Sequence, residues 1–149
     1  MNIRSDRRFR FDEAPATVWA ALTQVECYRL WWPWLSEFEG ARFVGGERWE
    51  CVVQPPLPYR LRLSITLLRI DEQKFVQAHV DGDITGSAEL SLHAMPGGRA
   101  CEVRLVSTLA PVSAMLRTVA LLARPAAIFG HDWVLDTGAR QFRSSAIEG

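Results

Sequence analysis

The chain has 149 residues, of which 48% are hydrophobic and 23% charged, a composition typical of one globular domain spanning residues 1–149. Lysine plus arginine and aspartate plus glutamate number 17 each, so the formal net charge is zero. This balance argues against a nucleic-acid partner. The N-terminus lacks an apolar signal segment, and no apolar run is long enough to span a bilayer. We therefore expect a cytoplasmic protein without a transmembrane segment.

The first third of the chain predicts a strand followed by two short helices. Residues 3–11 alternate as a strand does, and Pro15 follows an acidic pair that is typical of a helix start. The apolar residues of this first helix recur at helical spacing: Val18, Trp19, Leu22 and Val25. A second short helix over residues 27–31 is expected to stop at Pro33.

Residues 37–110 alternate between apolar and polar side chains, which is typical of half-buried strands. The clearest alternation runs over residues 60–67. Turn residues such as Gly45-Gly46 separate about six such segments. The short turns predict an antiparallel meander with one wet face and one dry face.

A long helical segment after Pro111 extends to about residue 146, and Pro125 is expected to kink or split it. A curved sheet wrapped around this helix would cover the dry face of the sheet. At about 100° per residue, His131 falls at the centre of the apolar helix face, whereas Asp132 falls on the opposite, polar side. His131 and Asp132 therefore diverge and do not form a catalytic dyad.

His131 has three interpretations: a core histidine hydrogen-bonded to a neighbour, a polar group in the wall of an internal cavity, or a catalytic acid/base. The other two histidines, His79 and His93, fall at strand positions predicted to face solvent. No pair of histidines has metal-ligand spacing, and the three cysteines lack CxxC spacing, so we expect neither a metal nor a cofactor. A Gly-x-Ser-x-Gly turn is also missing, which leaves Ser107 as only a candidate inward-facing hydroxyl.

Three tryptophans, Trp31, Trp32 and Trp34, stand beside Pro33. They predict either an aromatic plug where the short helices meet the sheet or an aromatic rim at a pocket mouth. In the second case Trp32 or Trp34 would reach a ligand.

A second apolar stripe runs along another side of the long helix, and one helix face cannot cover both this stripe and the sheet. This stripe indicates a contact with a partner subunit, as in a homodimer, and it consists of Met115, Leu122, Phe129 and Trp133.

Four segments, in their order and spacing, resemble the START/Bet v1-like (SRPBCC) superfamily, and specifically its bacterial polyketide cyclase/dehydrase-like proteins. They are APATVWAALTQVECYRLWWPWL at 14–35, PPLPYRLRLSITL at 55–67, GDITG at 82–86 and HDWVLDTGARQF at 131–142. The resemblance implies an α+β helix-grip fold, in which a curved antiparallel sheet of about seven strands wraps around a long C-terminal helix and encloses a hydrophobic cavity. The superfamily includes carriers, receptors and aromatase/cyclases, so the resemblance assigns no catalytic residue.

These patterns favour a protein that binds a small hydrophobic or aromatic molecule, lipid- or polyketide-like, in an internal cavity. The predicted cavity wall consists of Trp32, Trp34, Trp49, Cys51, Val53, Leu63, Ile65, Val103, Leu105, Ser107, His131, Val134 and Leu135. His131 and Ser107 would orient the polar end of the ligand. One alternative is a cyclase or dehydratase with His131 as general acid/base. A second alternative is a homodimeric interaction protein without a ligand.

Overall fold

Seven strands form one antiparallel sheet within the part of the chain that the computed structural model describes, residues 2–55, 60–112 and 124–147, with the backbone alone for 124–131. The strand order is β1-β7-β6-β5-β4-β3-β2. The strands are β1 (Ile3–Phe11), β2 (Leu35–Glu39), β3 (Arg48–Val53), β4 (Leu61–Asp71), β5 (Phe75–Gly82), β6 (Ile84–Ala94) and β7 (Cys101–Pro111). This sheet confirms the α+β helix-grip fold and its strand count.

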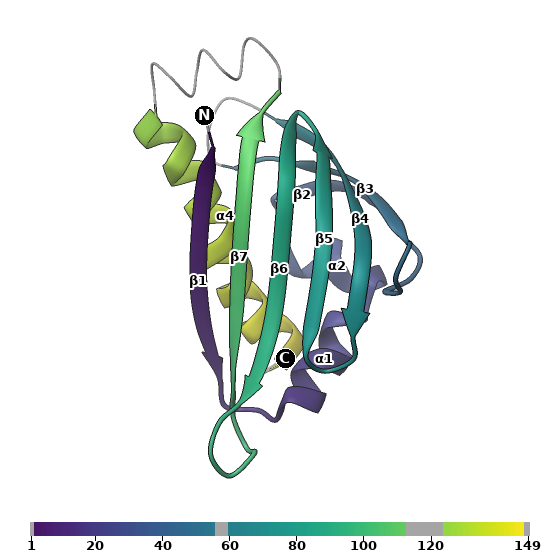
Figure 1. Ribbon diagram of the computed structural model, residues 1–149, viewed down its shortest axis with the longest axis vertical. Coiled ribbons are helices and arrows are strands. Elements are labelled where there is room, and N and C mark those ends of the chain that lie inside the picture. Colours follow the sequence, from purple (N-terminus) through teal and green to yellow (C-terminus); the bar gives the residue numbers. More distant parts are fainter. Residues whose placement is uncertain (1, 56–59, 113–123, 148–149) are drawn as a thin grey trace.

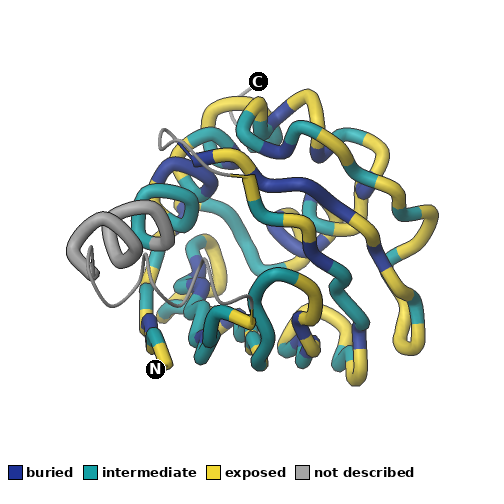
Figure 2. Tube along the Cα trace, turned by 90° about the horizontal axis from the view of Figure 1, so that it is seen from above, coloured by how far each residue is buried: buried dark blue, intermediate teal, exposed yellow. Residues whose placement is uncertain are grey.

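The helices lie on the concave side of the sheet (Figures 1 and 2). They are α1 (Pro15–Leu22), η1 (Val25–Cys27), α2 (Tyr28–Trp31), α4 (Arg124–Phe142) and the π-helical turn η2 (Arg143–Ile147). The two short helices after the first strand are confirmed. Pro125 is the second residue of α4, which begins at Arg124. The preceding part of the predicted long helix falls within residues 113–123, outside the described part, so the kink or split expected at Pro125 stays a prediction. Among the described residues, no helix is long and apolar enough to cross a membrane.

Alternation along the strands sorts side chains between the helix-covered face and the open face of the sheet. In β5, Val76, Ala78 and Val80 are buried, whereas His79 between them is exposed. His93 in β6 is exposed as well, so both histidines face solvent as predicted. The burial pattern thus follows the period of two that the sequence showed.

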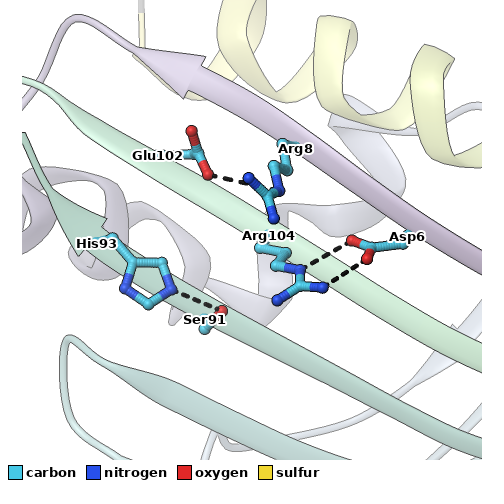
Figure 3. A network of polar contacts seen from close by, with 6 residues as sticks. All are labelled: Asp6, Arg8, Ser91, His93, Glu102 and Arg104. Carbon is cyan, nitrogen blue, oxygen red and sulfur yellow. Dashed lines mark hydrogen bonds and ion pairs between the residues drawn. The ribbon is translucent and has the colours of Figure 1, made fainter.

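Polar and charged side chains lie on the open face of β1, β7 and β6, where Asp6, Arg8, Glu102 and Arg104 stand beside Ser91 and His93 (Figure 3). The Arg104 guanidinium donates to both carboxylate oxygens of Asp6, at 2.8 and 2.5 Å, and thereby lowers the pKa of Asp6. Arg8 lies 3.8 Å from Glu102. Such exposed pairs contribute little to stability, and they mark this face as solvated.

Two glycines permit close strand contacts where β5 ends and β6 begins. Gly82 has φ +118° and Gly86 has φ +154°, conformations that residues with a side chain rarely adopt. A Cβ at Gly86 would lie 1.9 Å from the carbonyl oxygen of Thr108, and a Cβ at Gly82 would lie 2.4 Å from that of Arg62. Glycine is therefore required at both positions for the strands to pair.

Replacing Gly86 with alanine is expected to destabilise the fold, because the new methyl group meets the β7 backbone in an unfavourable conformation. We expect Gly86→Ala to lower the free energy of unfolding by about 3 kcal/mol. The matched control is Gly97→Ala, where φ is +90° but nothing lies within 4 Å, with an expected loss of about 1 kcal/mol. Urea unfolding measures both values, and equal losses would contradict the steric argument.

Candidate ligand-binding cavity

A cavity of about 310 Å³ lies between the sheet and α4. It is bounded by the inward side chains of β3, β4 and β7, by the segment after α2, and by α4. Its wall contains most of the residues predicted from the sequence: Trp32, Trp34, Trp49, Cys51, Val53, Leu63, Ile65, Leu105, Ser107, Val134 and Leu135. The inward side chains predicted from strand alternation and those predicted from the helix face therefore line the same cavity.

Two predicted wall residues stand apart from this set. Val103 is 5% exposed and belongs to the hydrophobic core, but it does not line the cavity. The cavity occupies the C-terminal half of β7 from Leu105 onward, whereas Val103 pairs with Phe9 and Leu92 in the filled half of the sheet. The side chain of His131 lies outside the described residues, so all three of its interpretations remain predictions.

Further wall residues were absent from the sequence-based prediction of the site. They are Ile3, Tyr28, Leu35, Phe38, Pro55, Leu61, Ile84, Ala88, Leu109, Ala110 and Pro111. Leu61, Ala88 and Leu109 belong to the alternating apolar sets of their strands, so parity alone could have found them. The aromatic rings of Tyr28 and Phe38 could not be assigned this way, because nothing local in the sequence shows which rings reach the cavity.

The three neighbouring tryptophans at the end of α2 and after it fit both predictions, the aromatic plug and the aromatic rim. Trp31 is buried, 8% exposed, and packs edge-on against Phe142 at 5.5 Å between ring centroids. Trp32 and Trp34 line the cavity and stack on each other at 5.7 Å. The segment therefore supplies a core residue and two wall residues.

The indoles of Trp32 and Trp34 are both hydrogen-bonded to α4. Trp32 Nε1 donates to the carbonyl oxygen of Gly138 at 2.9 Å, and Trp34 Nε1 donates to Oε1 of Gln141 at 2.9 Å. These bonds use the N–H groups of both rings within the protein. The rings therefore offer the cavity carbon surface rather than donors.

The other large aromatic side chains of the wall follow the same rule. Trp49 Nε1 donates to the carbonyl oxygen of Arg42 at 3.0 Å, and the Tyr28 hydroxyl donates to the carbonyl oxygen of Leu22. Burial raises the pKa of Tyr28 above its ordinary value, with the charge of Glu26 adding to the effect. Tyr28 is thus a neutral, internally satisfied wall residue.

Charge is absent from the described wall. None of its described residues carries a formal charge at neutral pH. Burial, assisted by the charge of Glu50, raises the pKa of Cys51 to about 11, so its thiol stays protonated and is a poor nucleophile. Of the other cysteines, Cys101 is buried, whereas Cys27 is only partly buried. The described residues contain no group of three histidine, cysteine or acidic side chains that could hold a metal.

Comparison with known proteins identifies the class. The family described as "Polyketide cyclase / dehydrase and lipid transport" matches residues 13–127, and the chain belongs to this family. No sequence among the curated proteins matches the chain.

Solved structures with low sequence identity share the fold. A START superfamily protein from Mycobacterium smegmatis is 12% identical, with a TM-score of 0.69 over 97% of both chains. Ara h 8.0201 is 12% identical, with a TM-score of 0.68 over 100% of both chains. An aromatase/cyclase from a Streptomyces species is 12% identical, with a TM-score of 0.66 over 100% of this chain and 99% of the other. At these identities the likeness concerns the fold alone.

Proposed function

We propose that the protein binds a small, largely apolar molecule, lipid- or polyketide-like, in the cavity between the sheet and α4. The observation that carries the proposal is the chemistry of the wall. Apart from the uncharged Ser107 hydroxyl and Cys51 thiol, the described wall is built of aliphatic and aromatic carbon with tryptophan and tyrosine polar groups. The N–H and O–H groups of its tryptophans and of Tyr28 are already bonded within the protein. Such a surface gains free energy by contact with apolar surface and gains nothing from a charged one.

The cavity size supports a ligand of a few rings or a short acyl chain. Its volume of about 310 Å³ falls at the lower end of the ~300–1,000 Å³ range of small-molecule sites. An engineered apolar cavity of ~150 Å³ already holds benzene. Two fused aromatic rings are therefore a reasonable probe of the site, and N-phenyl-1-naphthylamine is a neutral fluorescent molecule of this kind.

Filling the cavity from the sheet side is expected to abolish binding without disturbing the fold. Ala88 lines the cavity, whereas its neighbour Ser87 is exposed on the opposite face of β6. We expect Ala88→Trp to weaken binding of N-phenyl-1-naphthylamine at least about tenfold, because the indole occupies the ligand's space. Ser87→Trp is the matched control and should bind as the wild type does.

Fluorescence titration of both variants, with circular dichroism melting to check folding, measures this difference. Equal binding by Ala88→Trp and Ser87→Trp would show that the probe binds elsewhere and would remove the basis of the proposal.

Binding of a neutral probe is expected to be independent of pH. Cys51, with its pKa raised to about 11, and Tyr28, with its pKa raised above the ordinary value, both stay protonated around neutrality. We therefore expect the dissociation constant of N-phenyl-1-naphthylamine to stay within about twofold between about pH 6 and about pH 9.

The cyclase/dehydratase alternative makes a different prediction. His131→Ala should then keep binding N-phenyl-1-naphthylamine but lose turnover of a poly-β-keto substrate, because the general acid/base is removed. Unchanged turnover in His131→Ala would contradict this alternative.

A further inference from the structure

A second hollow, of about 210 Å³, runs along the edge strand β1 where α4 passes beside it. It is lined by residues 2–7 and by Asp132 of α4. Four of these residues carry a formal charge, Arg4, Asp6, Arg7 and Asp132, in contrast to the uncharged cavity wall. Ile3 lines both spaces, so the polar hollow and the apolar cavity share this wall residue.

The Ser5 hydroxyl lies at this junction. Ser5 is only 6% exposed, and in the register of β1 and β7 it stands directly opposite Ser107, which lines the cavity. Among the described residues, the hydroxyl of Ser5 makes no hydrogen bond. Buried hydroxyl groups are nearly always hydrogen-bonded, so this group is poised to bond a molecule that enters the hollow.

The charged residues around the hollow determine which kind of ligand group, charged or uncharged, binds there. Arg7 lies 2.8 Å from the carboxylate of Asp132 and 3.8 Å from that of Asp136. Because Arg7 is already paired with these carboxylates, the hollow offers a charged group little net attraction to offset the hydration that the group would lose. An uncharged group that both donates and accepts a hydrogen bond loses less hydration, and it matches the donor and acceptor capacity of Ser5.

We propose that residues 2–7 and Asp132 form a polar subsite for the uncharged hydroxyl end of an amphipathic ligand whose apolar body lies in the cavity. This inference rests on the proposed function, and it adds the chemical class of the ligand. In this arrangement the Ser5 hydroxyl forms a hydrogen bond with the ligand hydroxyl, as donor or as acceptor. Ile3 contacts the ligand where its polar and apolar parts join.

Two ligands of the same shape test the subsite: 2-naphthol carries the hydroxyl group, and 2-methylnaphthalene carries a methyl group in its place. Both are measured by displacement of N-phenyl-1-naphthylamine. We expect Ser5→Ala to weaken 2-naphthol about fivefold, the effect of one hydrogen bond, and to leave 2-methylnaphthalene within about twofold. The control is Ser91→Ala, which removes a hydroxyl from the open face of the sheet (Figure 3) and should change neither affinity.

A second variant tests the charge argument without altering Ser5. Arg7→Gln removes the positive charge that lies beside Asp132 and Asp136, so 2-naphthylmethylammonium should bind about threefold more tightly than to the wild type, and 2-naphthoate should not. Comparable changes for both ions would overturn the placement of the polar end beside Arg7.

The outcomes separate this inference from the proposed function. Wild-type binding of both naphthyl compounds with no selective loss of 2-naphthol in Ser5→Ala overturns the subsite and leaves the apolar cavity as the binding site. Binding of neither compound overturns the subsite and the proposed function together.

Discussion

The hydrogen bonds from Trp32 and Trp34 to the C-terminal helix are the contacts on which the cavity depends. They join residues 106 and 107 positions apart in the chain and tie the segment after α2 to α4 on the helix-covered face of the sheet. Gly138 makes the approach close, since a Cβ there would lie 3.1 Å from Cζ2 of Trp34. The same two bonds use the polar groups of the indoles, so one interaction sets both the shape of the wall and its apolar chemistry.

Apolar side chains lose dispersion contacts wherever no packed neighbour covers them. The wall of the cavity of about 310 Å³ is such a surface. The sheet remains stable around it because the other half of its concave face is densely filled, with Phe11, Val103 and Phe142 buried there. A ligand that occupies the space would recover part of the lost contact energy.

Much of the architecture could be predicted from the sequence, because alternation and helical spacing record which face of each element is buried. Most of the strands, the two short helices and the inward positions of β3 and β4 follow from these two periods, whereas the count of seven strands came from the family resemblance. The alternation shows which side chains of a strand face inward, but it does not show which part of the strand borders the cavity. For this reason Val103 was expected in the cavity wall, although the wall on β7 begins at Leu105. Ring orientation was likewise beyond local patterns, since it depends on Gly138 and Gln141 more than a hundred residues away.

The most direct measurement of the central claim is an isotope-edited nuclear Overhauser experiment on methyl-labelled protein with N-phenyl-1-naphthylamine bound. The account predicts contacts between the probe and the methyl groups of Leu63, Ile65 and Leu105 in the cavity wall. Contacts confined to the exposed Leu30 and Leu68, with none to these three residues, would contradict it.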